Sequence, residues 1–317
     1  MKIPEYKDLK EKEKAFGDNY QRIASIKELK RFLDATESYS ECIFRGICEA
    51  KYKNFTSAQR KYIINDLASV NINDLIQKQI EAVGRKNKHL LGRYYKSFDI
   101  VPNDFLYLGI AQHYGGISPL LDFTTDFKTA LFFMTDGAAF PVQGDDDIGN
   151  YSSLYYVPNN GFADFNDFLI SVTEKVSSKI EELVGDNELD LKTGNDIIAL
   201  LADFEHFKGI NKDISFLIPN KRKMHKIPIK GKKRWLSGVF SISNLNIVAQ
   251  KGCFVFYLPV TQTLPFEKPL RCLDIHKSLI PYISEYNRLK RSDIYPDEYE
   301  LVKDSCSKVL RNILNKQ

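Results

Sequence analysis

The chain has 317 residues, of which 43% are hydrophobic and 12% aromatic, and its 45 Lys and Arg nearly balance 41 Asp and Glu. This composition supports a buried core and excludes a chain that is disordered throughout. The longest apolar run, near residues 253–260, is far shorter than the ~20 residues of a membrane-spanning helix, so none is predicted. Five cysteines without CxxC spacing, and a charged N-terminus without an apolar leader, favour reduced thiols in the cytoplasm.

The N-terminal part of the chain contains an arm, a capped helix and a short strand. Residues 1–24 are highly charged and weakly apolar, so we expect a mobile arm or a frayed helix there. A capping-box spacing that begins at Ser25 predicts the start of a helix. Residues 41–46 indicate a short strand, and residues 56–85 have helical periodicity with a break near Asn71.

The middle of the chain mixes helices with short strands. We predict a helix over 103–114, a strand over 120–125, a helix capped by Asp126 that ends near residue 135, and a strand over 151–157. Strands that are scattered between helices, without regular strand–helix–strand alternation, indicate an α+β fold rather than a doubly wound sheet.

The second half of the chain has weaker periodicity. The elements expected there are helices at 164–184 and 195–208, strands at 214–218, 238–249 and 252–260, and a mostly helical stretch over the last forty-five residues. Among them, Lys221–Arg234 forms a basic loop that holds eight Lys or Arg and no acid, followed by Trp235. This loop either binds RNA, DNA or another polyanion, with Trp235 stacked on a base, or is an ordinary solvated loop.

The densest group of unusual polar residues lies in two neighbouring segments, 111–115 and 120–125. His113 stands at the end of a predicted helix, and Asp122 and Thr124 have the parity that places two side chains on one face of a strand. An unpaired buried polar group costs ~1–3 kcal/mol, so these side chains need partners. The group is either a binding site or an internal hydrogen-bond network that locks the loop between the two segments.

Arg45 is a second candidate, because it follows an apolar strand and directly precedes Gly46. A guanidinium group is well matched to phosphate, and a glycine lets a ligand approach the backbone closely. The alternative is an arginine that is paired with a carboxylate such as Asp122.

His113 could act as a general base or bind a sugar hydroxyl, because imidazole takes up and releases protons near neutral pH. No other His or Cys stands at metal-ligand spacing from it, so we predict no metal site.

Several ordered motifs resemble those of the FRG domain family, which is named for Phe-Arg-Gly. They are Phe44-Arg45-Gly46, Gln112-His113-Tyr114-Gly115, Leu120-Leu121-Asp122-Phe123-Thr124, Ala130-Leu131-Phe132-Phe133, a closing strand pair around Gln250 and the tail Ile294–Glu298. Where the family has Thr-Arg before Leu-Leu-Asp, this chain has Ser118-Pro119, so any ligand role of that arginine is missing.

The resemblance spans residues 25–312 and implies a division of the chain into three parts. We expect an N-terminal charged arm (1–24), an FRG domain (25–265) with a helical and basic insertion at about 160–235, and a C-terminal helical extension (266–317).

The same order of motifs is more distantly similar to the ADP-ribosyltransferases. That resemblance implies a core of split β-sheets flanked by helices, with NAD as the bound nucleotide. Arg45 would hold the pyrophosphate or ribose, and the Gly46 backbone would bind the nicotinamide carboxamide. Thr124 and Thr125 would shape the site, with Tyr114 from the His113 motif as a further cofactor-binding residue.

Gln250 falls nearest to the position where those transferases carry a glutamate. Cleavage of the nicotinamide–ribose bond develops positive charge on the sugar, and loss of a well-placed electrostatic partner costs on the order of 10²–10³ in rate. The catalytic candidates are Arg45, His113, Asp122 and Gln250. Either Asp122 supplies the missing negative charge, or a binding site remains without catalysis. Gln250 could also be an ordinary hairpin residue.

The hypothesis that best explains these features is an NAD-dependent ADP-ribosyltransferase or NAD glycohydrolase, such as a toxin or phage-defence effector. It would act in the cytoplasm, without a metal, on an unknown macromolecular acceptor. The alternative is a non-catalytic module that binds nucleic acid or a protein partner, in which the polar cluster is structural.

Overall fold

The fold was analysed in a computed structural model of the chain. The structure describes the following residues: 2–35, 41–97, 102–139, 141, 147–158, 172–185, 190–207, 213–218, 222–229, 232–239 and 245–296. None of the helices within these ranges combines the length and apolarity needed to cross a bilayer.

Seven strands form one mixed sheet in the order β1-β9-β4-β2-β3-β8-β5. Their bounds are β1 (Tyr20–Ile23), β2 (Cys42–Ile47), β3 (Leu120–Thr124), β4 (Tyr151–Pro158), β5 (Ile214–Ile218), β8 (Gly252–Leu258) and β9 (Arg271–His276). The β1–β9 pair is parallel and the other pairs are antiparallel. The predicted α+β class is confirmed.

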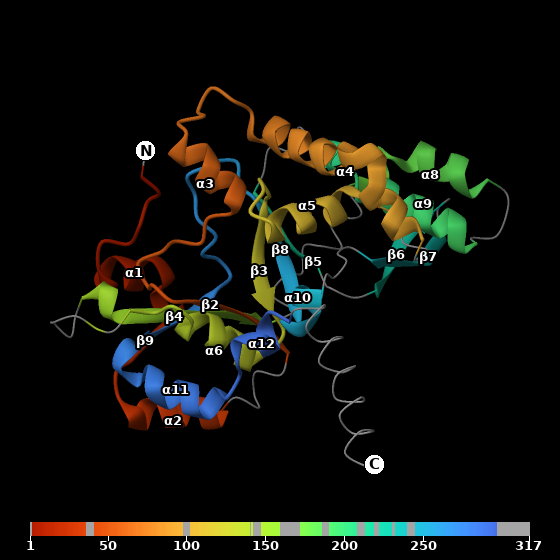
Figure 1. Ribbon diagram of the computed structural model, residues 1–317. Helices are drawn as coiled ribbons and strands as arrows, with labels where there is room; N and C mark the ends of the chain where they lie inside the picture. The colour runs from red at the N-terminus through yellow and green to blue at the C-terminus, as the bar shows by residue number, and fades with distance from the viewer. Residues whose placement is uncertain are drawn as a thin grey trace, which may run out of the picture.

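The sheet is nearly divided between β2 and β3. These two strands share a single register pair, Phe44 with Thr124, whereas β2 pairs with β4 over six residues and β3 with β8 over five. In Figure 1, β2 and β4 run across the view while β3 and β8 run down it. Two half-sheets therefore meet at one point and diverge from it, which leaves room for side chains from both. A relationship of this core to the ADP-ribosyltransferases remains a proposal.

Helix α6 (Phe127–Thr135) packs directly on β2. Asp126 accepts a hydrogen bond from the Thr129 amide at 2.8 Å, so the predicted helix cap is confirmed. A Cβ atom at Gly46 would lie 1.9 Å from the carbonyl oxygen of Ala130. Glycine is therefore required here because a helix backbone rests on the strand, which is not the ligand-approach reason that the sequence suggested.

Two further helices, α2 (Ile26–Asp34) and α11 (Ile280–Asn287), lie beside each other next to this half of the sheet (Figure 1). The capping box predicted at Ser25 is present, with side-chain and backbone bonds to Glu28 in both directions. Leu29 of α2, Ile283 of α11 and Ala130 of α6 belong to one buried cluster, which explains the apolar stripe of α2.

The other half of the sheet is covered by long helices. The predicted helix over 56–85 is α3 (Ser57–Ile64) and α4 (Ile72–Lys96), separated by Asn71, which caps α4. Helix α5 (Asp104–His113) matches the prediction for 103–114. Phe105 of α5 meets the stacked pair Phe216 and Phe256, whose ring centroids are 4.7 Å apart. Helices α8 (Ser177–Val184) and α9 (Leu191–Leu201) complete this core.

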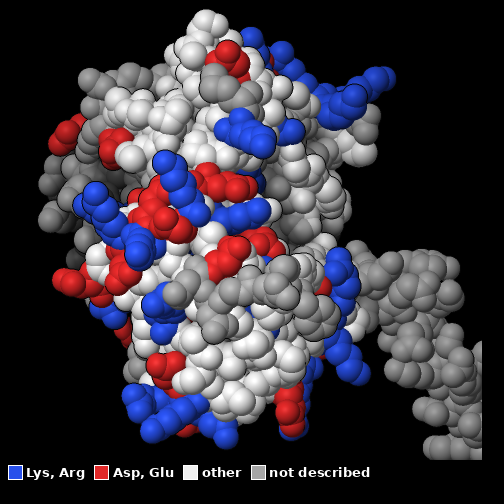
Figure 2. Space-filling view, turned by 90° about the vertical axis from the view of Figure 1, so that its left-hand side faces the viewer, with Lys and Arg blue, Asp and Glu red and all other residues white. Residues whose placement is uncertain are grey.

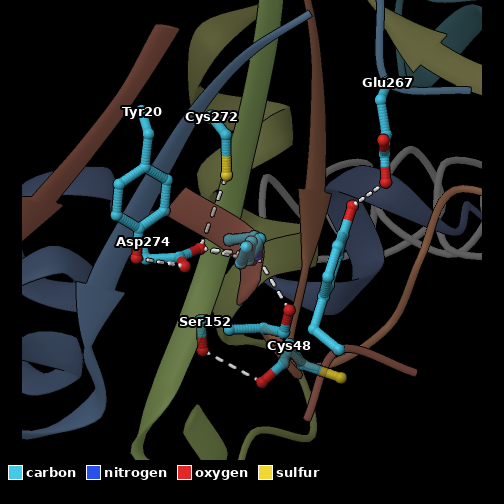
Figure 3. Close-up of polar contacts among 10 residues, drawn as sticks. Tyr20, Cys48, Ser152, Glu267, Cys272 and Asp274 are labelled. Atoms are coloured by element: carbon cyan, nitrogen blue, oxygen red, sulfur yellow. Dashed lines mark hydrogen bonds and ion pairs between the residues drawn. The ribbon is translucent and has the colours of Figure 1, made fainter. Parts of the chain in front are cut away.

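The N-terminal residues are part of the fold and are neither the mobile arm nor the frayed helix that the sequence predicted. They form α1 (Leu9–Phe16) and β1, and Lys12 is completely buried. Its ammonium group donates to Asp274 at 2.7 Å, to Ser153 at 2.6 Å and to the Ala50 carbonyl at 2.8 Å. Figure 3 shows Asp274 between the phenol of Tyr20 and the thiol of Cys272. The partners of Lys12 lie far from it in the sequence, so the pattern of neighbouring residues could not predict that it is buried.

The region after residue 265, predicted as a mostly helical extension, also supplies a strand of the main sheet. It contributes β9, which pairs with β1 on one side and with β4 on the other. Lys277, directly after β9, is also buried and donates to Glu49 and to the Gly149 carbonyl, both at 2.7 Å. Residues 297–317 lie outside the described part.

Two predictions for residues 221–249 are also wrong. The basic segment is an antiparallel hairpin of β6 (Arg222–Ile229) and β7 (Lys232–Val239), not a loop. The strand predicted over 238–249 is replaced at its end by α10 (Leu245–Ala249), a helical turn that buries Ile247 and leaves Val248 exposed. Strands β5 and β8 confirm the predictions for 214–218 and 252–260.

Candidate functional site

A pocket of about 290 Å³ lies where the two half-sheets diverge. Its walls come from β2, the end of α5, β3, α6, the residue that follows α10, and the segment after α12 (Arg291–Ile294). The lining residues are Phe44, Arg45, Gly46, Gln112, His113, Asp122, Phe123, Thr124, Phe133, Gln250 and Tyr295. The structure thus places six of the predicted site residues around one cavity: Arg45, Gly46, His113, Asp122, Thr124 and Gln250.

Arg45 lines this pocket from β2. Its Nε donates to Asn54 at 3.2 Å, and one terminal nitrogen donates to the backbone carbonyl of Asp122 at 2.8 Å. The side chain is only 16% exposed, and burial lowers its pKa, opposed by the charge of Asp122. Guanidinium has five N–H donors, so Arg45 keeps donors for a ligand beyond the two it spends on the protein.

Asp122 is the one carboxylate among the described lining residues. Its Oδ2 accepts a hydrogen bond from the side chain of Gln112 at 2.9 Å and lies 4.0 Å from a terminal nitrogen of Arg45. The side chain is 58% exposed. Arg45 and Asp122 are therefore not a closed, fully buried pair, and the carboxylate is reachable from solvent.

His113 is the last residue of α5 and is held from the opposite wall. Its Nε2 lies 3.2 Å from the amide nitrogen of Asn246 on α10. An amide nitrogen can only donate, so Nε2 is the acceptor and the ring proton is on Nδ1. Tyr114 is 76% exposed, contacts the His113 ring edge to face, and does not line the pocket.

Thr124 and Gln250 are joined to each other. The Thr124 hydroxyl donates to the Gln250 carbonyl at 2.7 Å and accepts from the Asp126 amide at 2.9 Å. The Gln250 side chain donates to the Ile294 carbonyl at 3.2 Å. Thr125 bonds the Lys251 carbonyl at 3.3 Å and lies outside the pocket lining. These contacts assign the two threonines a part in holding α6 and the Gln250 turn together.

The sequence interpretation missed the aromatic wall of the pocket. Phe133 of α6 and Tyr295 meet at 6.2 Å between ring centroids, nearly at right angles. Arg291 places its guanidinium over the Tyr295 ring and pairs with Asp136 at 2.9 Å, which fixes the segment after α12. The resemblance of the tail at 294–298 to the FRG family was the signal that this segment matters.

A second arginine near the pocket was also missed. Arg60 lies on α3 and is exposed, and its side chain makes no hydrogen bond or ion pair with the described residues. Surrounding protein atoms lower its pKa, while the charge of Asp122 raises it. Asp122 therefore interacts electrostatically with two guanidinium groups, those of Arg45 and Arg60, so positive charge exceeds negative charge at this end of the site.

A larger apolar groove of about 610 Å³ runs along α4 and is unrelated to the polar cluster. Its described walls, which include Val83, Leu90 and Tyr94, belong to that helix alone. It contains none of the predicted site residues.

Comparison with known proteins gives one match. The family model of the FRG domain matches residues 40–140, a range that holds β2, α3, α4, α5, β3 and α6. No curated protein and no solved structure matches the chain. Arg45, His113 and Asp122 lie inside the matched range, whereas Gln250 and Tyr295 lie outside it. Residues 40–140 of the chain therefore form an FRG domain.

Proposed function

We propose that the pocket binds NAD or a related nucleotide and supports ADP-ribosyl transfer or NAD hydrolysis. The observation that supports this most is the convergence of Arg45, His113 and Asp122, from three separate elements, on one solvent-reachable pocket. A guanidinium group, an imidazole and a carboxylate beside an aromatic wall suit a ligand that has a phosphate, sugar hydroxyls and a planar ring.

In this proposal Asp122 replaces the missing glutamate. The bond between nicotinamide and C1′ of the ribose breaks, and its electron pair leaves on the nicotinamide nitrogen. Positive charge develops on the sugar, and the carboxylate stabilises it. An acceptor or a water then forms a bond to C1′ and passes its proton to the Asp122 carboxylate. His113, whose Nε2 accepts from Asn246, donates its Nδ1 proton to a sugar hydroxyl oxygen. Gln250 supplies no charge, and its amide instead holds the backbone at Ile294.

Arg45 would bind the pyrophosphate and Tyr295 with Phe133 would contact the planar ring. Four described cysteines, Cys42, Cys48, Cys253 and Cys272, are free thiols, and we propose a cytoplasmic setting where NAD is the substrate. A toxin or defence effector is a role that such chemistry would suit.

Calorimetry with NAD tests this proposal. We expect binding at or below millimolar concentration, and loss of at least tenfold in affinity for Arg45→Ala, because a charge-assisted contact to phosphate is removed. Arg31→Ala, at an exposed position on α2, is the matched control and is expected to bind as the parent does. Absence of heat at millimolar NAD would refute the proposal.

A second candidate is a binding module without catalysis. Several polar groups of the pocket already form hydrogen bonds within the protein, among them the Thr124 hydroxyl and the Gln250 amide. This favours a structural role for them over a catalytic one. Its partner would be a nucleic acid or another polyanion on Lys221–Arg234. On the face shown in Figure 2, Lys and Arg alternate with Asp and Glu, so this face has no uniformly basic patch that would bind a polyanion. A steep salt dependence of RNA or DNA binding, lost in a Lys/Arg→Ser series across 221–234, would support this candidate.

A further inference from the structure

Asp122 is held on one side and open on the other. Its Oδ2 accepts from Gln112 at 2.9 Å, and its backbone carbonyl accepts from Arg45 at 2.8 Å. Within the part of the chain that the structure describes, Oδ1 accepts no hydrogen bond. Because Oδ2 is held, the carboxylate that lines the pocket is fixed in position, and Oδ1 is free to accept a hydrogen bond from a ligand.

The orientation of the Gln112 side chain explains its hydrogen bond to Oδ2 of Asp122. Its Oε1 faces the Ser57 hydroxyl at 3.0 Å, so its amide nitrogen turns toward Asp122. The Ser57 oxygen accepts from the Ser118 amide at 3.0 Å, which leaves the hydroxyl proton to be donated. The carbonyls of Gly116 and Ser118, at 2.9 and 3.1 Å, are the other acceptors in reach of that proton.

We infer that Gln112 is a positioning residue that makes Asp122 a hydroxyl acceptor, so that the pocket selects a phosphorylated sugar with its hydroxyls intact. The carboxylate accepts strongly from a sugar hydroxyl, and Arg45 beside it matches a phosphate. A pocket of about 290 Å³ is at the small end of ligand sites, which suits a sugar phosphate with one attached ring. This inference rests on the proposed nucleotide function because it concerns the same pocket.

Two small probes test the selectivity without NAD. Ribose 5-phosphate and 2-deoxyribose 5-phosphate carry the same phosphate but differ by one hydroxyl, and their affinities can be compared by NMR titration. We expect the parent protein to bind the ribose compound about tenfold more tightly, the size of one hydrogen bond to a charged group. In Gln112→Leu the preference is expected to disappear while phosphate binding through Arg45 persists.

Gln79→Leu is the matched control. The Gln79 side chain accepts from the Ile117 amide at 3.1 Å, so this variant loosens the same turn without touching Asp122. It is expected to keep the preference for ribose. Thermal unfolding of each variant shows whether the protein is folded before affinities are compared.

Gln112→Glu gives a readout that a merely structural role would not move. The introduced carboxyl can donate to Asp122 only when it is protonated, and two ionised carboxylates in contact repel. The preference for ribose is therefore expected to be weak at pH 8 and to return at pH 5.

Equal affinity for the two sugars in the parent, an unchanged preference in Gln112→Leu, or no binding of either sugar would overturn the inference. A parallel NAD titration separates it from the proposed function. NAD binding without sugar discrimination refutes only the inference, whereas discrimination without NAD binding refutes only the NAD proposal.

Discussion

The molecule contains two polar clusters, each built around a cation and a carboxylate. The closed cluster, around Lys12 and Asp274, uses its hydrogen-bonding groups within the protein, and the open cluster, around Arg45 and Asp122, does not. In the closed cluster, Lys12 donates each of its three protons to the protein, and both oxygens of Asp274 are bonded. In the open cluster, Arg45 and Asp122 leave donors and an acceptor unused at a pocket. A buried charge that is completely paired fixes the fold, whereas a charge with unused hydrogen-bonding capacity is available to a ligand.

The largest effect is expected from breaking the closed cluster. Lys12→Ala leaves Asp274 buried without its cation, so the free energy of unfolding should fall by about 3–5 kcal/mol. Urea denaturation measures this change. The double variant Lys12→Met with Asp274→Leu is expected to regain much of the stability, because neither charge is then left unpaired. A loss below ~1 kcal/mol in Lys12→Ala would show that the pair is not closed as described.

Gly46→Ala is expected to damage the fold at the edge of the open cluster. The added Cβ would lie 1.9 Å from the Ala130 carbonyl oxygen, so α6 must shift away from β2. We expect a loss of about 3 kcal/mol or more in the free energy of unfolding. Gly137→Ala, where a Cβ meets no atom within 4 Å but φ is +75°, is a control that reports backbone strain alone. Equal losses in the two variants would contradict the packing explanation.

Asp104, a half-buried carboxyl outside both clusters, separates the effect of burial from that of pairing. Desolvation raises the pKa of Asp104, at the start of α5, to about 6. Its folded pKa lies above the unfolded one, so the folded state binds the extra proton and stability falls as pH rises from about 4 to 6. Asp104→Asn should remove up to ~3 kcal/mol of this dependence and be more stable than the parent at pH 7. Thermal unfolding at pH 5 and pH 7 checks this, and parallel curves for the two proteins would contradict it.

The smallest effect concerns the other wall of the open cluster. Asn246→Ala removes the donor to His113 Nε2, a hydrogen bond worth about 1 kcal/mol. The ratio of the two neutral ring tautomers should shift about fivefold toward Nε2–H. Nitrogen-15 NMR of the imidazole measures that ratio, and an unchanged ratio would show that Asn246 does not orient the ring.

Local signals in the sequence predicted the elements that carry the site. The cap at Asp126, the break at Asn71 and the end of α5 depend on neighbouring residues, which is why they could be read from the chain. They placed Arg45 and His113 near the ends of their elements and Asp122 within a short strand.

Contacts between distant segments could not be predicted. Strand β9 was missed because its partners β1 and β4 lie far away in the sequence, and Lys12 is an unusual residue to find in a core. Tyr295 lines the pocket only because α12 packs near α10, which no periodicity encodes.

A crystal structure of the protein grown with millimolar NAD tests the central claim most directly. We predict a nucleotide in the pocket between the half-sheets, with an anionic group on Arg45 and a sugar hydroxyl on Oδ1 of Asp122. An empty pocket, or a nucleotide bound only elsewhere on the molecule, would contradict the claim that the open cluster is a nucleotide site.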